Sequence, residues 1–294
     1  MKCGESAMWV AEKWKDYELI DCGNGERLER WKDTVLVRPD PQAIWEPEGK
    51  IRLWDKPDAR YIRSQTGGGK WETYSLKDKS WSISYDSLTF LVKPMNFKHT
   101  GVFPEQAVNW DFARRQIRAA KRPVSVINLF GYTGCATLAC LEAGASVCHV
   151  DAAKGMVDWA QNNAAASDLS ERPVRWIVDD CLKFIEREIK RGRKYDGIIM
   201  DPPSYGRGPT GEIWKIEDDL YRLVCRAAVL LSDKPLFFLL NLYTAGMAPS
   251  VGGYMLGRVL RPKFGGMVES DEIGLKVGST GLNLPCGATS RWHY

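Results

Sequence analysis

Apolar and polar positions alternate in short segments over the first third of the chain. Residues 34–37, 71–76 and 81–85 place apolar or aromatic side chains at every second position. A period of two is typical of half-buried strands, and turn signals such as residues 22–25, Cys-Gly-Asn-Gly, separate the segments. This pattern predicts a small β-rich domain over residues 1–95.

From residue 124 onward, strand-sized apolar runs alternate with segments of helical spacing. Near-continuous apolar strands separated by helices are typical of a parallel sheet covered on both faces. We therefore expect an α/β fold, with a Rossmann-like doubly wound sheet in a domain of residues 96–294. A helix predicted from Pro104 to about Lys121 leads into it, and the tail 265–294 predicts a terminal hairpin. The expected strands are 124–130, 146–151, 174–179, 195–201 and 235–243, and the expected helices are 135–143, 152–167, 182–191 and 217–231.

Length and composition narrow the class of protein. The chain of 294 residues has room for one or two domains. A hydrophobic content of 44% and a charged content of 27% are those of an ordinary soluble globular protein. No run approaches the roughly 20 apolar residues of a membrane span, and the N-terminus has no apolar targeting segment. We expect a soluble, cytoplasmic protein with no membrane partner.

Charge and metal-binding residue types change this picture little. The net charge of +4 is compatible with a phosphate-rich partner but does not identify one. The eight cysteines form no C-x-x-C pair, so the sequence indicates neither a zinc knuckle nor a disulfide framework. His149 and His293 have no partner histidine at metal spacing, and we therefore predict no metal site.

A glycine turn follows the first expected strand of the α/β region. Residues 128–134 read Asn-Leu-Phe-Gly-Tyr-Thr-Gly, and glycines at this place let the backbone approach a ligand closely. The dinucleotide fingerprint G-x-G-x-x-G is absent here, which counts against NAD. A plain turn without a ligand is the alternative interpretation.

Carboxylates follow the next two expected strands. Asp151 ends the second strand, where it can accept hydrogen bonds from both ribose hydroxyls of an adenosine-containing cofactor; its alternative is a helix N-cap. Asp179 and Asp180 end the third strand, where one can accept from an adenine amino group while the other caps the next helix. We narrowly favour Asp180 for the cofactor.

The fourth expected strand runs into Asp201-Pro202-Pro203-Ser204-Tyr205. Two prolines cannot continue a ladder, so the chain leaves the sheet in a rigid loop that fixes the Asp201 carboxylate and the backbone carbonyls as acceptors. An amino group held by these acceptors would be oriented for attack on a sulfonium methyl, and Tyr205 could stack on a base. An ordinary Pro-Pro turn is the alternative.

In order and spacing these motifs resemble class I S-adenosylmethionine (SAM)-dependent methyltransferases, in the bacterial branch related to 23S rRNA methyltransferases. The likeness is close over about residues 95–294 and looser before them. It rests on residues 98–106 (Lys-His-Thr-Gly-Val-Phe-Pro-Glu-Gln), 128–134, 149–151, 178–180 and 201–205. The resemblance implies that the glycine turn holds the methionine part of SAM, Asp151 the ribose and Asp180 the adenine. It also places Phe103 and Gln106 near the cofactor or the substrate entrance.

One departure bears on the methylated atom. Methylation of cytosine at C5 needs a thiolate that adds to the ring, and one such group of enzymes has Cys after Pro in the loop where this chain has Pro203-Ser204. Cys286, which follows Pro285, is a possible nucleophile, although a lone cysteine in a tail is more often structural. The absence of a cysteine after Pro203 favours a nitrogen atom as the methyl acceptor.

Basic and aromatic side chains leave two interpretations open. Arg114 and Arg118 share one face of the helix predicted from Pro104, together with Lys121 or Arg122. The stripe could bind phosphate, or it could be a solvated surface. The tryptophan-rich N-terminal part could stack on single-stranded RNA, but aromatics at alternating strand positions are more often core.

These observations predict a SAM-dependent methyltransferase acting on a nucleic-acid base, with ribosomal RNA as the expected substrate. The alternatives are methylation of a protein or small molecule, an RNA-binding module with a degenerate pocket, and, third, a nucleotide-dependent oxidoreductase. The catalytic candidates are Asp201, Pro202 and Tyr205, and the candidates for substrate contact are Pro203, Ser204, Tyr205, Arg114 and Arg118. The candidates for the cofactor are Phe103, Gln106, Asn128, Phe130, Gly131, Tyr132, Thr133, Gly134, Asp151, Ala152, Asp180, Cys181 and Asp201.

Overall fold

The computed structural model describes residues 8–48, 51–64, 68–207, 213–244 and 246–294. Two compact units make up the chain. Unit 1 contains Val108–Ile273, Cys286–Tyr294 and the start of the chain up to Trp9, and unit 2 contains Val10–Ala107 and Gly274–Pro285. The predicted division after residue 95 therefore lies within unit 2, which also takes in residues 274–285 from the tail.

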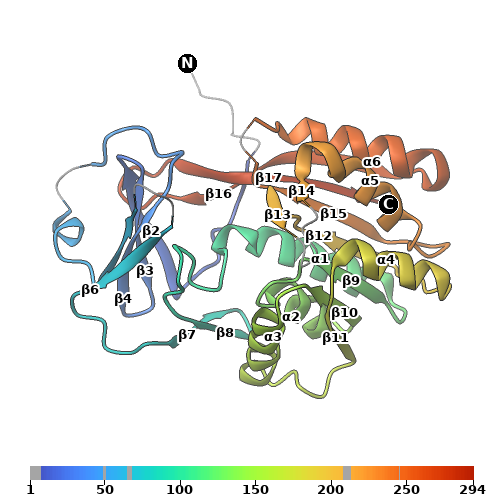
Figure 1. Ribbon diagram of the computed structural model, residues 1–294, viewed down its shortest axis with the longest axis horizontal. Helices are drawn as coiled ribbons and strands as arrows, with labels where there is room; N and C mark the ends of the chain where they lie inside the picture. The colour runs from blue at the N-terminus through green and yellow to red at the C-terminus, as the bar shows by residue number, and fades with distance from the viewer. Residues whose placement is uncertain (1–7, 49–50, 65–67, 208–212, 245) are drawn as a thin grey trace. The chain divides into compact units, whose positions relative to one another are not determined.

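Unit 1 is built on a largely parallel sheet, shown in Figure 1. The sheet has eight strands in the order β1-β16-β17-β15-β12-β9-β10-β11. Strands β15, β12, β9, β10 and β11 run parallel, and β17 pairs antiparallel with β15. The bounds are β1 Trp9–Val10, β9 Ser125–Leu129, β10 Ser146–Asp151, β11 Val174–Val178, β12 Gly197–Met200, β15 Phe237–Leu242, β16 Met267–Lys276 and β17 Asn283–His293.

Helices cover both faces of this sheet. The core on one face joins side chains of α4, α5 and α6 to alternate strand residues such as Ile127, Ile198 and Leu240, all fully buried. On the other face Phe112 of α1 packs edge-on against Phe237 of β15, with ring centroids 5.9 Å apart. The helices are α1 Ala107–Ala120, α2 Cys135–Glu142, α3 Lys154–Ala166, α4 Cys181–Lys190, α5 Ile216–Ala228 and α6 Pro249–Phe264. Burial of both faces explains the near-continuous apolar strands, and the predicted doubly wound α/β class is confirmed.

Unit 2 is β-rich, as the period-two pattern predicts. One sheet has the order β2-β3-β4-β5-β6, with β4 and β5 parallel and the other pairs antiparallel, and β7 and β8 form a separate hairpin. Its core contains Trp31 and Phe90, both fully buried. The bounds are β2 Tyr17–Gly23, β3 Glu26–Trp31, β4 Thr34–Pro39, β5 Ala59–Arg63, β6 Gly69–Thr73, β7 Trp81–Tyr85 and β8 Leu88–Val92, with 3-10 turns at Arg52–Trp54 and Pro104–Gln106.

The helices of the described part of the chain are too short or too polar to cross a bilayer.

Candidate functional site

The carboxyl ends of four parallel strands of unit 1 meet at one edge of the sheet. Leu129 of β9 is level with Val150 of β10 and with Met200 of β12, and Asp151 is level with Val178 of β11. The segments that follow these residues therefore leave the sheet side by side. They carry the glycine turn, Asp151, the Asp179-Asp180 pair and Asp201, all of which are candidates from the sequence.

The glycine turn is a strained backbone segment that leaves no room for a side chain at Gly131 or Gly134. Phe130 and Tyr132 have φ of 58° and 50°, and Gly134 has φ of 84°, a region that favours glycine. A Cβ on Gly131 would collide with the imidazole of His149, and one on Gly134 would lie 2.7 Å from Cβ of Ala160 in α3. The G-x-x-G spacing thus reflects close packing of the turn against β10 and α3.

A buried chain of hydrogen bonds holds in place the side chains on which this turn packs. Asn128 Nδ2 donates to Thr137 Oγ1 over 2.9 Å, and Thr137 Oγ1 lies 2.9 Å from His149 Nδ1. The Thr137 hydroxyl therefore links the amide of Asn128 to the imidazole of His149. Burial lowers the pKa of His149 to about 4, consistent with a neutral ring. Asn128, predicted to contact the cofactor, is itself buried in this chain.

The other predicted residues of the turn are also held by protein partners. The Thr133 side chain is fully buried, and its carbonyl accepts from Asn163 Nδ2 over 2.8 Å. The Phe130 amide donates to Cys181 Sγ over 3.3 Å, and burial raises the pKa of that thiol well above its ordinary value. The support of the turn by Thr137 and His149 was not predictable from the sequence, because a polar residue inside an apolar run does not reveal which partner it has across the fold.

Asp151 fixes two backbone segments at once. Its Oδ2 accepts from the Tyr132 amide and its Oδ1 from the Ala153 amide, each over 2.9 Å. Helix α3 begins after Ala153, the N-cap residue, without a side-chain cap, so Asp151 is not the N-cap of the alternative interpretation. Each carboxylate oxygen keeps a second lone pair. The half-buried carboxylate can therefore accept hydrogen bonds from a ligand as well, beside the exposed Ala152.

The acids at the end of β11 have structural partners. Asp180 is the N-cap of α4, and its Oδ1 accepts from the Lys183 amide over 2.8 Å. Asp179 forms an ion pair with Arg187. The helix-capping interpretation thus holds for Asp180, whereas its contact with a cofactor stays a prediction.

The loop 201–205 is anchored in its second half. Trp214 Nε1 donates to the Pro203 carbonyl over 2.6 Å, and the Ile216 amide donates to the Ser204 carbonyl over 3.1 Å. Ser204 Oγ lies 2.6 Å from Thr244 Oγ1. Trp214 belongs to the hairpin of β13 (Tyr205–Arg207) and β14 (Ile213–Lys215). The sequence analysis missed Trp214 and Thr244, which come from segments that carry no motif.

The first half of the loop presents acceptors at the sheet edge. Asp201 is half-buried and its amide donates to the Leu129 carbonyl over 3.4 Å. Pro202 is buried, yet none of the described residues donates a hydrogen bond to its carbonyl. Since buried backbone carbonyls are nearly always paired, this one fits an external donor. Tyr205 is 51% exposed, as a stacking residue must be.

The basic stripe on α1 is tied to acids. Arg114 is buried, with its Nε 3.1 Å from Glu142 and its Nη1 3.4 Å from Asp111. Arg118 is more exposed and donates to both oxygens of Glu142 over 2.6 and 2.7 Å. Contact with RNA phosphate stays a prediction for both residues, and Arg114, itself buried, would first have to leave its half-buried acidic partners. Cys286, the possible nucleophile, is buried.

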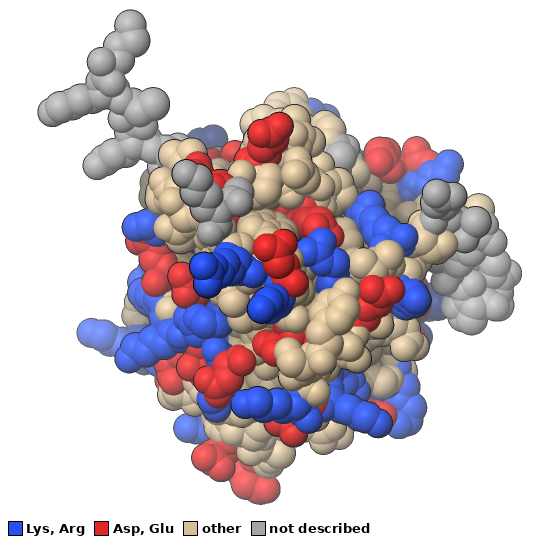
Figure 2. Space-filling model, turned by 90° about the vertical axis from the view of Figure 1, so that its left-hand side faces the viewer, with Lys and Arg blue, Asp and Glu red and all other residues tan. Residues whose placement is uncertain are grey.

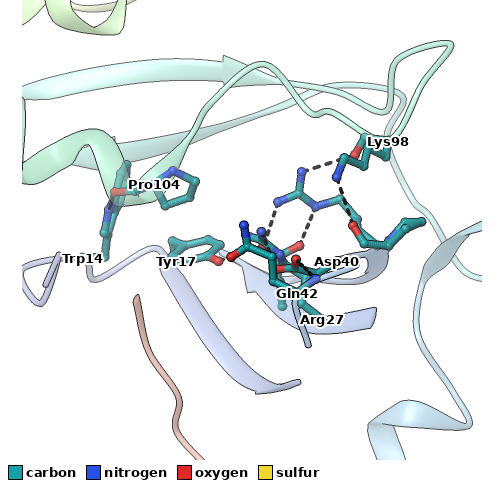
Figure 3. Close-up of polar contacts among 10 residues, drawn as sticks. Trp14, Tyr17, Arg27, Asp40, Gln42, Lys98 and Pro104 are labelled. Atoms are coloured by element: carbon teal, nitrogen blue, oxygen red, sulfur yellow. Dashed lines mark hydrogen bonds and ion pairs between the residues drawn. The ribbon is translucent and has the colours of Figure 1, made fainter. Parts of the chain in front are cut away.

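Phe103 and Gln106 belong to unit 2, where a buried polar network anchors the segment 98–106 (Figure 3). Arg38 donates to Glu29 over 2.5 and 2.6 Å and to the Lys98 carbonyl over 3.2 Å. Trp14 Nε1 donates to the Pro104 carbonyl over 2.9 Å. Burial opposes the charge of Glu29, but the adjacent Arg38 holds the pKa of its carboxyl below the ordinary value. Approach of Phe103 and Gln106 to the cofactor stays a prediction.

Several aromatic residues of unit 2 belong to its core. Tyr17, Trp31, Tyr61, Tyr85 and Phe90 are buried in its core. In the view of Figure 2, lysine and arginine side chains are interspersed with aspartate and glutamate. The core interpretation therefore holds for these aromatic residues.

Comparisons with known proteins agree with this geometry. The family model for S-adenosylmethionine-dependent methyltransferases matches residues 63–248. The crystal structure of the SAM-dependent methyltransferase from Agrobacterium tumefaciens is 37% identical, with a TM-score of 0.92 over 98% of this chain and 94% of that one. A methyltransferase structure in complex with SAH, 17% identical, shares the fold with a TM-score of 0.70.

Among curated proteins, the ribosomal RNA large subunit methyltransferase K/L of Pseudoalteromonas atlantica is 30% identical over 245 residues. The match covers 76% of this chain and 34% of that protein. The chain thus spans about a third of the length of the curated relatives that it matches.

Proposed function

This chain belongs to the S-adenosylmethionine-dependent methyltransferase family, and from that premise we propose that it methylates a base of ribosomal RNA at a nitrogen atom. Membership confirms the expected family and its cofactor, SAM. The observation that carries the proposal is the pair of acceptors at the sheet edge, the Asp201 carboxylate and the Pro202 carbonyl. Pro202 is a buried residue, and none of the described residues donates a hydrogen bond to its carbonyl.

The residues at the edge suit SAM by the chemistry of their donors and acceptors. Asp151 can bind the ribose hydroxyls with the lone pairs that its two backbone bonds leave over. Asp180 and the backbone around Cys181 lie at the end of the neighbouring strand, where they can meet the adenine. The turn of Phe130, Gly131, Tyr132, Thr133 and Gly134 would hold the methionine part.

The acceptor side of the site orients a base. The Asp201 carboxylate and the Pro202 carbonyl accept the two protons of an exocyclic amino group, which directs the nitrogen lone pair outward, and Tyr205 stacks on the base. SAM supplies an electrophilic methyl group on a sulfonium that departs as a neutral thioether. As the N–C bond forms and the S–C bond breaks, the nitrogen loses one proton to Asp201 or to water. Positioning, rather than strong acid–base chemistry, is what the residues contribute.

The choice of RNA as substrate rests on the relatives. The curated relatives are named as ribosomal RNA large subunit methyltransferases, and three of them match 76%, 70% and 58% of this chain. A cytoplasmic location follows from such a substrate. A small or protein substrate on the same fold is the main competing function.

The test uses the full chain, radiolabelled SAM and the Asp201→Ala variant. We expect wild type to bind SAM and to label ribosomal RNA, and Asp201→Ala to bind SAM within about threefold of wild type while losing roughly 100- to 10,000-fold of turnover. The matched control is Asp158→Ala, which removes a surface carboxylate paired with Lys154. Retained turnover in Asp201→Ala, or label in protein rather than RNA, would contradict the proposal; nucleoside mass spectrometry identifies the methylated atom.

A further inference from the structure

Trp214 contacts both halves of the edge described above. Its indole Nε1 donates to the Pro203 carbonyl over 2.6 Å. Its ring also lies 6.3 Å from the ring of Phe130, centroid to centroid, at an interplanar angle of 43°. Phe130 is the first residue of the glycine turn and has a positive φ. One side chain thus contacts the turn that follows β9 and the loop that follows β12.

The hairpin that carries Trp214 is short but well connected to the body of unit 1. Trp214 is cross-strand partner of Gly206, and a Cβ on Gly206 would lie 3.7 Å from Cβ of Trp214. Ile216, two residues further on, is fully buried at the start of α5, and its amide holds the Ser204 carbonyl.

The hydrogen bonds that anchor the loop 201–205 go to Pro203 and Ser204, and none of those described goes to the Pro202 carbonyl. Trp214 uses the Pro203 carbonyl, Ile216 uses the Ser204 carbonyl, and Thr244 uses the Ser204 hydroxyl. Pro202, with its carbonyl, precedes all three anchors. Because the two prolines restrict rotation about φ, an anchor at Pro203 fixes the direction of the Pro202 carbonyl as well.

We propose that Trp214 is a positioning residue that couples the cofactor turn to the acceptor loop and thereby sets the distance between methyl donor and acceptor. This inference deepens the proposed function and rests on it. The indole N–H fixes the position of the acceptor loop through its bond to the Pro203 carbonyl. The indole ring fixes the position of the cofactor turn through its contact with Phe130. The two contacts are chemically separable, which makes the proposal testable.

Two variants separate the contacts. Trp214→Phe keeps an aromatic ring beside Phe130 but removes the donor to Pro203. We expect it to lower kcat on ribosomal RNA about 10- to 100-fold, because small misplacements of reacting groups cost rates of this order, with SAM affinity within about twofold of wild type. Trp214→Ala removes the ring too, and we expect SAM affinity to fall about tenfold in addition.

The matched control is Trp81→Phe, which deletes an indole donor to the Trp31 carbonyl at 3.1 Å in unit 2. It should leave kcat and SAM affinity unchanged. A purely structural role for Trp214 predicts instead that Trp214→Phe lowers thermal stability without separating kcat from SAM affinity, and this result would overturn the inference.

The measurement on wild type separates failure of the proposed function from failure of the role proposed for Trp214. Turnover by wild type together with full turnover by Trp214→Phe overturns the role of Trp214 and leaves the proposed function intact. Failure of wild type to label RNA overturns the proposed function and with it the acceptor half of the inference. The SAM affinity of Trp214→Ala still decides the cofactor half, which an unchanged affinity would refute.

Discussion

Acidic side chains at the edge of the unit 1 sheet and in the core of unit 2 have opposite environments. At the edge of the unit 1 sheet, Asp151 and Asp201 are half-buried, and Asp151 is bonded to backbone amides. In unit 2, Glu29 is fully buried and satisfied by Arg38 and by the hydroxyl of Tyr17, at 2.8 Å. Asp151 therefore keeps lone pairs with which it can accept from a ligand, whereas the carboxylate of Glu29 is bonded to protein partners on both oxygens.

The difference shows that burial and a perturbed pKa do not by themselves locate a site. Glu29 and His99 of unit 2 both have pKa values below their ordinary ones; burial and the adjacent Arg38 and Lys98 lower that of His99 to about 3. In unit 1, by contrast, the proposed site consists of acceptors at the ends of parallel strands, the edge at which open α/β sheets bind ligands. Buried charge stabilises one particular structure, and accessible charge is available for chemistry.

The largest effect should follow from breaking the buried pair of unit 2. Glu29→Gln leaves Arg38 buried without a counter-charge, and we expect the free energy of unfolding to fall by about 3–5 kcal/mol. The control is Glu18→Gln on the neighbouring strand, which breaks an exposed pair with Arg30 at 3.2 Å and should cost at most about 1 kcal/mol. Chemical denaturation measures both. A Glu29→Gln protein of normal stability but weakened SAM binding would contradict the contrast between the units.

A slightly smaller effect should appear as a pH dependence in unit 1. Folded protein keeps His149 neutral down to about pH 4, while the unfolded chain binds a proton near the ordinary pKa of 6.5. As pH falls from 6.5 to 4, only the unfolded state gains that proton, so stability decreases, by about 3 kcal/mol in total.

Denaturation of His149→Gln at pH 7 and pH 4.5 isolates this contribution. The variant should lose less stability than wild type between the two pH values. An identical pH dependence of wild type and His149→Gln would mean that the buried imidazole chain under the glycine turn does not respond to protons.

The smallest effect concerns the accessible acid that holds the glycine turn. Asp151→Ala removes the acceptor of the Tyr132 and Ala153 amides together with the proposed acceptor of the ribose. We expect SAM affinity to fall about 10- to 100-fold, equivalent to about 1.4–2.8 kcal/mol, with a smaller loss of folding stability. Calorimetric titration with SAM measures the change; an unaltered affinity would remove Asp151 from the cofactor site.

The alternation of apolar and polar residues was sufficient to predict much of the architecture. Period-two segments predicted the β-rich unit 2, and apolar runs separated by helical spacing predicted the parallel sheet of unit 1. Both patterns are local, because they follow from which faces of a strand or helix are buried. The positions of the glycine turn, Asp151 and Asp201 at one sheet edge followed from the same argument, since parallel strands end together.

Tertiary structure alone decided which partner each polar group has. Asp180 caps α4, Arg114 is buried against Glu142, and Trp214 anchors Pro203 across an interval that no motif spans. It also assigned residues 274–285 to unit 2, far along the chain from the rest of that unit. Periodicity specifies which side of an element is buried, whereas a hydrogen bond or an ion pair depends on residues that only the folded chain brings within about 3 Å of each other.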